Sequence, residues 1–274
     1  IDEKFTDSLA GRKRIFNLNT LSFHEYLLYR EFSEADAIQS GKQFSIPAQR
    51  RLNELLDEYA VYGGYPEVIL AYDAQEKQDI LTELGDSYVK KDALEAGVTK
   101  TDKYVYLMRL LSTQIGNLFN SNECAGTLGI NRLTVDSYIR IMRVSNHITA
   151  IKPFFSNVRK ELTKMPKIYF NDHGLRNRFY NDFSIFAIRP DKGALLEQVV
   201  FRFFLDMYRE EEIAFWRTPK QHEVDFIIRR EMAYEIKWNS SNFSPSKYKT
   251  FNSLYSKIPL QCVSRENAAT FVLK

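Results

Sequence analysis

Apolar and polar residues alternate along residues 222–238, HEVDFIIRREMAYEIKW, which is the pattern of two β-strands joined by a charged turn. Side chains alternate between the two faces of a strand, so the apolar even positions should form one buried face. Those positions are Val224, Phe226, Ile228, Met232, Tyr234, Ile236 and Trp238. A hairpin closed by Ile228 and Met232 places Asp225 opposite Glu235 on the other face.

The same register fixes the remaining partners of the hairpin. It places Val224 opposite Ile236 on the buried face and Glu223 opposite Lys237 on the charged face. Slipping the register by one residue would bring carboxylates opposite isoleucine, so the apolar pattern selects this pairing.

Helical spacing of apolar residues predicts an amphipathic helix at 46–60, followed by a break at 63–64 and Pro66. A second helix is expected at 193–212, GALLEQVVFRFFLDMYREEE. Its apolar face consists of Leu195, Leu196, Val199, Val200, Phe203, Phe204 and Met207. Glu197 lies between the two apolar pairs, where a solvent-facing residue is not expected. We therefore expect Glu197 to point at the acids of the hairpin.

Capping residues mark the ends of shorter helices. Ser22 is suited to begin a helix at LSFHEYLLYREF, and Asp172 to cap a helix at 174–181. Gly129 should end the short helix NECAGTLGI.

Residues 103–170 follow the order helix, short helix, tight turn, helix and β-hairpin, which is typical of a winged helix-turn-helix. In this interpretation Leu133, Val135, Tyr138, Ile139 and Met142 pack inward. The basic residues left on the outer surface are Arg132, Arg140 and Arg143 on the helix and Lys152, Arg159, Lys160 and Lys164 in or beside the wing. Such a local basic surface indicates DNA binding. A structural or protein-docking role is the alternative, because many winged helices bind protein.

The charged face of the hairpin predicts a metal site. Directly opposed residues have Cβ atoms about 4.5–5.5 Å apart, so Asp225 and Glu235 would repel without a cation. Mg²⁺ suits such oxygen ligands, with Glu197 as a third acid from the packed helix. Lys237 would then complete an arrangement typical of phosphodiester hydrolysis. The alternative is a Glu223–Lys237 salt bridge on a solvated sheet edge.

Composition narrows the class of protein. The chain has 274 residues, of which 44% are hydrophobic and 27% charged, and a net charge of +3, as in ordinary globular proteins. Cys124 and Cys262 have no zinc-site or disulfide-framework spacing, which favours a reducing, cytoplasmic environment. No apolar run reaches the length of a membrane span, so no membrane association is expected.

Seven motifs occur along the chain in this order: LAGRKRIFNLNTLSFHEYL, YGGYPEVIL, PKIYFNDHGLRN, GALLEQVVF, FWRT, EVDFII and YEIKW. Together they resemble a family of prokaryotic AAA+ ATPases with a C-terminal domain of unknown function. The resemblance covers essentially the whole chain. It implies a mixed α/β (α+β) chain in four parts: the tail of the ATPase domain at 1–26, a helical linker region at 27–100, a winged helix-turn-helix at 101–165 and a PD-(D/E)xK nuclease-like sandwich at 166–274.

The resemblance also implies roles for individual residues. Glu197 corresponds to the helix acid of the nuclease-like fold, Asp225 to its aspartate, and Glu235 with Lys237 to its (D/E)xK element. Arg12 lies where such families place an arginine near the nucleotide or the neighbouring subunit. Homo-oligomers would form through the ATPase domain.

The chain has no GxxxxGK[ST] loop, so it should not hydrolyse ATP as it stands, and ATP would bind only in a domain upstream. We expect a C-terminal fragment of an AAA+ ATPase that binds DNA and has a Mg²⁺-dependent nuclease-like site. The alternative is a catalytically inactive nuclease-like module that binds a protein partner and is moved by the ATPase domain.

Overall fold

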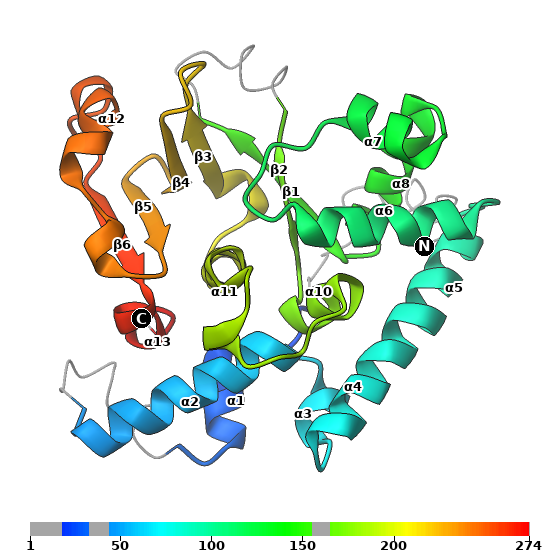
Figure 1. The fold of residues 1–274 in the computed structure, drawn as a ribbon, viewed down its shortest axis with the longest axis horizontal. Helices are drawn as coiled ribbons and strands as arrows, with labels where there is room; N and C mark the ends of the chain where they lie inside the picture. The colour runs from blue at the N-terminus through cyan, green and yellow to red at the C-terminus, as the bar shows by residue number, and fades with distance from the viewer. Residues whose placement is uncertain (1–17, 33–43, 155–164, 274) are drawn as a thin grey trace, which may run out of the picture.

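A computed structural model describes residues 18–32, 44–154 and 165–273. Its centre is a six-stranded mixed sheet with the order β2-β1-β3-β4-β5-β6 (Figure 1). The strands are β1 (Ile148–Pro153), β2 (Lys167–Phe170), β3 (Ile213–Arg217), β4 (Glu223–Ile228), β5 (Met232–Lys237) and β6 (Leu260–Ser264). Pairing is parallel between β1 and β3 and between β5 and β6, and antiparallel elsewhere. The predicted mixed α and β class is confirmed.

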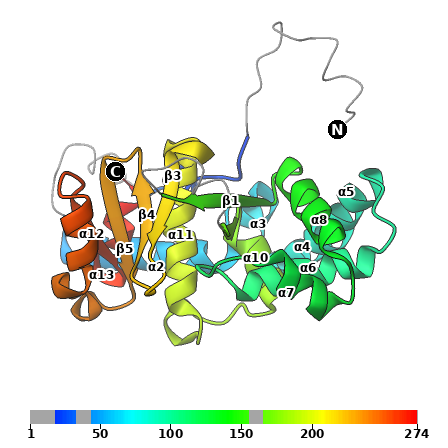
Figure 2. The same ribbon diagram turned by 90° about the horizontal axis from the view of Figure 1, so that it is seen from above.

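Helices surround this sheet and form most of the first half of the chain. They are α1 (Phe23–Tyr29), α2 (Ile46–Tyr62), α3 (Pro66–Leu70), α4 (Ala74–Glu83), α5 (Val89–Glu95), α6 (Thr101–Thr113), α7 (Ser121–Leu128), α8 (Arg132–Val144), α10 (His173–Tyr180), α11 (Lys192–Met207), α12 (Lys249–Leu254) and α13 (Arg265–Phe271). Viewed from above, α4 to α8 gather at one end of the molecule, and α12 and α13 lie at the other (Figure 2).

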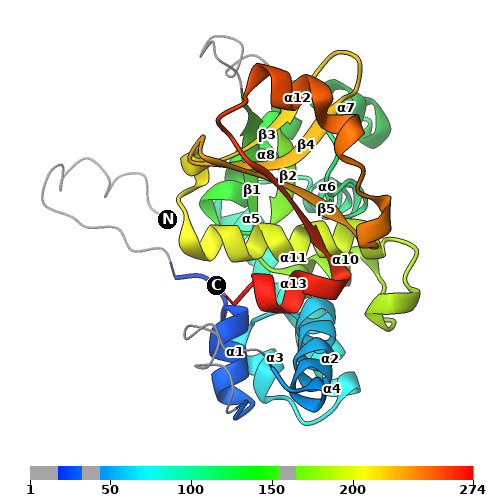
Figure 3. The same cartoon turned by 90° about the vertical axis from the view of Figure 1, so that its left-hand side faces the viewer.

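Two apolar clusters lie on opposite faces of the sheet. The larger one joins aromatic residues of α11, such as Phe201 and Phe204, to Phe226 of β4 and extends into α1, α2 and α6. The smaller one packs Trp216 of β3 against Phe251 of α12. Figure 3 accordingly shows α11 and α13 below the sheet, with α1 and α2 as a further layer, and α12 above it. A side chain of α11 that points toward the sheet, such as Glu197, therefore lies on the same face of the sheet as the larger cluster.

The predicted capping residues begin and end the helices as expected. Ser22 caps α1 in a capping box with Glu25, and Gly129 ends α7 in the left-handed conformation. Asp172 caps α10 by accepting a hydrogen bond from the Leu175 amide at 2.9 Å. Polar side chains with local backbone partners therefore fix these boundaries.

The buried carboxylate of Asp172 also joins segments that are distant in sequence. Its Oδ2 accepts hydrogen bonds from the Gly64 amide at 2.8 Å and from the Thr20 hydroxyl at 2.9 Å. Gly63 and Gly174 lie against each other here, so closely that a Cβ on Gly174 would lie 3.0 Å from the Gly63 nitrogen. The two predicted motifs YGGYP and NDHG are thus one packing unit.

The predicted register of the hairpin is confirmed at its closed end, where Phe226 pairs with Tyr234 and Ile228 pairs with Met232. Beyond Phe226 a register shift between β3 and β4 interrupts the alternation, as in a β-bulge. Val224 therefore packs in the smaller cluster on the α12 face, whereas Ile236 belongs to the larger cluster. The expectation that these two side chains share one buried face is wrong for this physical reason.

The turn between β4 and β5 has an unusual backbone. Arg229 and Arg230 both have positive φ, 51° and 63°, which side chains other than glycine rarely adopt. Arg229 pairs with Glu212 at 2.8 Å and lies over the ring of Tyr208. Arg230 lies over the ring of Phe154.

The β1–β2 hairpin follows α6, α7 and α8 in the predicted order, and β1 also pairs in parallel with β3. The hairpin is therefore continuous with the C-terminal strands, and the expected boundary at 165/166 falls between β1 and β2. In α8, Val135, Tyr138 and Met142 are buried as predicted, but Leu133 is 78% exposed, so its predicted inward packing is wrong. Leu133 occupies the first turn of α8, beyond the reach of the core.

None of the helices in the described part of the chain is long and apolar enough to cross a membrane.

Candidate charged site around Asp225

Three elements bring four acidic side chains to one region between the sheet and α11. Strand β4 supplies Glu223 and Asp225, β5 supplies Glu235, and α11 supplies Glu197. Asp225 is 8% exposed and Glu235 is 5% exposed. Burying carboxylates requires nearby cations or hydrogen-bond donors, because desolvation penalises the charged form.

A lysine that the sequence did not single out lies among three of these acids. Lys167, the first residue of β2, is fully buried. Its Nζ forms an ion pair with Glu223 and lies 3.4 Å from Glu197 Oε1 and 3.7 Å from Asp225 Oδ1. Burial acts to lower the pKa of Lys167, but the three carboxylates outweigh it and raise the pKa above its ordinary value. Lys167 is therefore a charged ammonium inside the cluster.

Glu197 was expected to point at the acids of the hairpin; it points toward the sheet, and its hydrogen-bonding contacts are with β2. Its Oε1 accepts a hydrogen bond from the Tyr169 hydroxyl at 2.5 Å in addition to its contact with Lys167. Burial raises the pKa of Glu197 to about 7, Lys167 opposes this rise and Asp225 adds to it. A Cβ on Gly116, whose φ is +78°, would lie 2.6 Å from Glu197 Oε2. The loop after α6 thus covers this carboxylate closely.

Glu235 and Lys237 form the second half of the site and contact each other. Lys237 Nζ forms an ion pair with Glu235 Oε1, while Glu235 Oε2 is buried with no hydrogen-bond partner in the described part of the chain. Burial and the charge of Asp225 raise the pKa of Glu235 to about 7, against the effects of Lys237 and Tyr248. An unsatisfied carboxylate oxygen thus lies in a region of excess negative charge.

Asp225 connects the two halves. Its Oδ1 faces Lys167, and its Oδ2 accepts a hydrogen bond from the backbone amide of Ile236 at 2.8 Å. Its charge raises the pKa of both Glu197 and Glu235. Among the ion pairs of the described residues, Glu223 contacts Lys167 and Arg217, and Lys237 contacts Glu235. The alternative expectation of a Glu223–Lys237 salt bridge is therefore wrong. The bulge in β4 accounts for this difference, because it directs Glu223 toward β2.

These contacts decide how a divalent ion would fit. No group of three or more His, Cys, Asp or Glu side chains within the described ranges is arranged to hold a metal, and Lys167 occupies the space between Glu197 and Asp225. Mg²⁺ commonly uses only one or two carboxylates, with water and substrate phosphate as its other ligands. Asp225 and the unsatisfied oxygen of Glu235 could meet that smaller requirement, whereas Glu197 is engaged by both Lys167 and Tyr169.

The predicted nucleic-acid surface is described only in part, because Arg159, Lys160 and Lys164 lie outside the described residues, as does Arg12. On α8, Arg132 lies 3.4 Å from Asp136, and Arg143 pairs with Glu210 at 2.6 Å. Arg140 also interacts with neighbouring groups.

Lys152 of β1 is exposed and lines a cavity of about 630 Å³ together with Arg143, Arg229 and Arg230. The acidic run Glu210, Glu211 and Glu212 lines the same cavity. The basic surface is therefore mixed with acids, which reduces its field toward phosphate.

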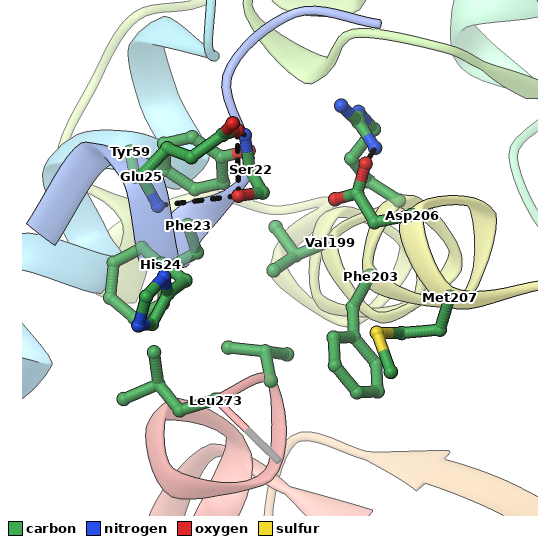
Figure 4. Close-up of a pocket in the computed structure, with 12 residues that line it drawn as sticks. Ser22, Phe23, His24, Glu25, Tyr59, Val199, Phe203, Asp206, Met207 and Leu273 are labelled. Carbon is green, nitrogen blue, oxygen red and sulfur yellow. Dashed lines mark hydrogen bonds and ion pairs between the residues drawn. The ribbon is translucent and has the colours of Figure 1, made fainter. Parts of the chain in front are cut away.

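A separate cavity of about 470 Å³ lies between α1, α11 and the last described residues, away from the predicted site residues (Figure 4). His24 and Phe23 face Val199, Phe203 and Met207 across it, and Leu273 lies at its base. His24 Nε2 and the buried Arg202 Nε have no hydrogen-bond partner in the described part of the chain. Arg202 is otherwise held by Asp206 and the Thr20 carbonyl.

Comparison with known proteins divides the chain into two matched regions. Residues 53–184 match a domain of unknown function (DUF8612), and residues 192–272 match another (DUF4143), which is typically found at the C-terminus of AAA-ATPase-like proteins. The two matched regions meet between α10 and α11.

Curated relatives have no described function. An uncharacterized protein of Methanocaldococcus jannaschii is 26% identical over 83% of this chain and 50% of its own length. An uncharacterized protein of Haemophilus influenzae is 26% identical over 85% of this chain and 56% of its own length. An uncharacterized protein of Mycobacterium tuberculosis is 26% identical over 57% of this chain and 36% of its own. The chain thus spans about half the length of the first two relatives. No solved structure matches it significantly.

Proposed function

We propose that this chain is the C-terminal part of an AAA+ ATPase and that it hydrolyses phosphodiester bonds of DNA with Mg²⁺ at Asp225, Glu235 and Lys237. The observation that supports this proposal is the buried Glu235 oxygen that has no hydrogen-bond partner among the described residues, next to a second buried carboxylate, Asp225. A carboxylate oxygen in that position is missing a cation or a donor. In this proposal the C-terminal half has the nuclease-like fold and the α6–α8 region is a winged helix.

Each residue of the site would have a separate role. Asp225 and Glu235 would hold Mg²⁺, which supplies Lewis-acid activation of water and stabilises developing charge on the phosphate. Lys237, whose side chain is 30% exposed, would keep its ammonium beside Glu235 and donate a hydrogen bond to the reacting phosphate or to the attacking water. The Ile236 amide donates a hydrogen bond to Asp225 and so helps to hold this carboxylate at the site.

Glu197 has a different role in this proposal from the one expected from the sequence. Its carboxylate is bound by Lys167 and Tyr169, so it shapes the site from α11 and is not a metal ligand. DNA would approach over α8 and β1, where Arg132, Arg140, Arg143 and Lys152 lie, with the wing residues Arg159 and Lys160 as further contacts.

Calorimetric titration with Mn²⁺ and Mg²⁺ tests the metal site. We expect the wild type to bind metal, and Asp225→Asn and Glu235→Gln each to abolish detectable binding, because each removes one of two carboxylates. Asp206→Asn is the matched control, since Asp206 is also a partly buried acid in an ion pair with a neighbouring cation. Equal titrations for the wild type and both site variants would refute the proposal. The companion assay is cleavage of labelled DNA in the presence of Mg²⁺, which the site variants should abolish.

The second candidate function is an inactive nuclease-like module that binds a protein partner. Two observations favour it: Lys167 already neutralises part of the acidic cluster, and Arg143 on the expected DNA surface is paired with Glu210. This candidate predicts no metal binding beyond that of Asp225→Asn and no DNA cleavage by a folded wild-type protein. The same titration therefore separates the two functions.

A further inference from the structure

Lys167 has the properties of a built-in cation. Its ammonium is fully buried and lies among carboxylates from two separate elements, α11 and β4. The ring of Phe215 lies 5.3 Å from its Nζ on a further side. A side chain with a long, flexible stem is normally exposed, so complete burial indicates that the carboxylates and the apolar neighbours hold it in place.

We infer that Lys167 limits the site to a single divalent ion, because its ammonium takes the position among Glu197, Glu223 and Asp225 where a second ion would bind. This inference rests on the proposed function, in which Asp225 and Glu235 hold the first ion. Two-metal sites place their ions about 3.5–4 Å apart and share a carboxylate between them. The shared carboxylate would be that of Asp225. One of its oxygens faces Lys167, and its charge contributes to the raised pKa of Glu235 in the other half of the site.

Charge balance indicates that the position of the Lys167 ammonium suits a divalent ion once the ammonium is removed. With all three carboxylates ionised, Lys167 together with Arg217, which lies 2.9 Å from Glu223, balances two of their three negative charges. A divalent ion in place of the ammonium would balance the third as well. Oxygens of Glu197 and Asp225 lie 3.4 Å and 3.7 Å from Nζ, and each would have to approach to about 2.1 Å to bind Mg²⁺ in its place.

The backbone holds Lys167 at this position. Lys167 pairs with Ile151 in the β1–β2 ladder and forms an isolated bridge with Leu118, and Phe119 donates to the adjacent Pro166 carbonyl at 2.7 Å. Lys167 therefore enters the cluster from a strand held on both sides, which makes its ammonium a fixed part of the site. As a positioning residue, Lys167 sets the number of bound metal ions through its ion pairs with Glu197, Glu223 and Asp225.

The test is the number of Mn²⁺ ions bound per chain by the wild type and by Lys167→Met, measured by calorimetry or electron paramagnetic resonance. Methionine keeps the length of the stem and removes the charge. We expect one ion in the wild type and two in the variant. Lys77→Met is the matched control, because Lys77 is also buried and paired with a glutamate, Glu58, in the helical region. It should lose stability without a change in ion number.

The outcomes separate the two proposals. No ion in the wild type would overturn the proposed function and, with it, the inference that rests on it. Equal numbers in the wild type and the folded variant would overturn the inference and leave the proposed function to its own test.

Unfolding of the variant is also informative. If Lys167→Met is unfolded without metal, Lys167→Gln, which keeps a neutral donor, is titrated in its place. Failure of both variants to fold even in millimolar Mn²⁺ would overturn the inference, because an ion bound only by the folded state must stabilise it.

Discussion

Single side chains set the charge of the site, and Asp225 has the greatest influence among them. It is held by a backbone amide, faces Lys167 with one oxygen, and its charge adds to the rise that burial causes in the pKa of Glu197 and Glu235. Glu197 and Glu235 therefore hold protons more firmly in the folded state than in the unfolded chain. This has a measurable consequence for stability.

The contribution of Glu235 to stability should fall as pH rises from its ordinary pKa of 4.5 to about 7. In that window the folded state binds a proton that the unfolded state has lost, so the free energy of unfolding decreases with pH. Glu235→Gln removes this dependence. In chelator-treated protein, the variant should gain stability relative to the wild type as pH rises through this window. The exposed Glu83→Gln, measured by the same urea titrations, is the control. A flat difference for Glu235→Gln would contradict the raised pKa.

Asp172 provides a prediction about stability away from the site. Asp172→Ala should cost about 2–4 kcal/mol, of which about 1 kcal/mol is the lost helix cap and the rest the unsatisfied buried amide of Gly64. Asp73→Ala is the matched control, because Asp73 caps α4 at an exposed position and should cost about 1 kcal/mol. Equal losses in chemical denaturation would show that the contacts of Asp172 with Gly64 and Thr20 contribute little.

The roles of individual residues could be predicted from the sequence where their partners lie a few positions away along the chain. Ser22, Gly129 and Asp172 act on backbone groups a few positions away, so a capping pattern sufficed to predict them. Lys167 was missed because its partners lie far away along the chain, on α11 and β4. Its only local signal was a lysine beginning an otherwise apolar strand, KIYF, and a strand-end lysine is usually exposed.

At the scale of elements, the bulge in β4 separates what periodicity could predict from what it could not. The apolar alternation fixed the hairpin register near the turn, and that register is present. A bulge adds one residue to one strand and leaves no period-two signature of its own. The faces of Val224 and Glu223 could therefore not be derived, and the Glu223 contact with Lys167 follows from that extra residue.

The loop between α6 and α7 should be sensitive to a single methyl group at Gly116. Gly116→Ala would introduce backbone strain at φ +78° and a contact of 2.6 Å with the Glu197 carboxylate. Gly97→Ala isolates the strain, because Gly97 has φ +79° with nothing within 4 Å of its Cβ position. We expect Gly97→Ala to cost about 1 kcal/mol and Gly116→Ala distinctly more.

Thermal and urea unfolding of the two variants measure this difference. Only Gly116→Ala should also alter the pH dependence of stability, because it moves Glu197. Identical costs and identical pH profiles would show that the loop can retreat from the carboxylate.

At the scale of the whole molecule, one sheet unites regions that appeared separate in sequence. The order of helices and hairpin in 103–170 was legible, but pairing of β1 with β3 brings together residues about sixty positions apart. Parallel pairing at that distance has no signal in a single sequence. The larger apolar cluster, which includes residues from Phe23 to Leu273, likewise depends on the complete chain.

The expected DNA surface gives a prediction at this scale, because α8 and the acidic segment after α11 meet there. Glu210→Gln releases Arg143 from its ion pair and should strengthen DNA binding. If Arg143 then contacts one further phosphate, the slope of log affinity against log salt should steepen by about 0.9. Fluorescence anisotropy across a salt series measures the slope, with Glu83→Gln as the control. An unchanged slope in Glu210→Gln would place Arg143 outside the contact surface.

The Arg229–Arg230 turn keeps the chain below its attainable stability. Left-handed backbone at two arginines is unfavourable, and Asn-Gly is the pair that suits two successive residues with positive φ at the centre of a turn. Grafting Asn-Gly there would remove the strain, and with it the guanidinium groups over Tyr208 and Phe154. This turn is remote from Asp225, so the graft changes the hairpin and not the charged site. A rise in melting temperature after the graft would measure the stability that the native hairpin loses by having two arginines in its turn.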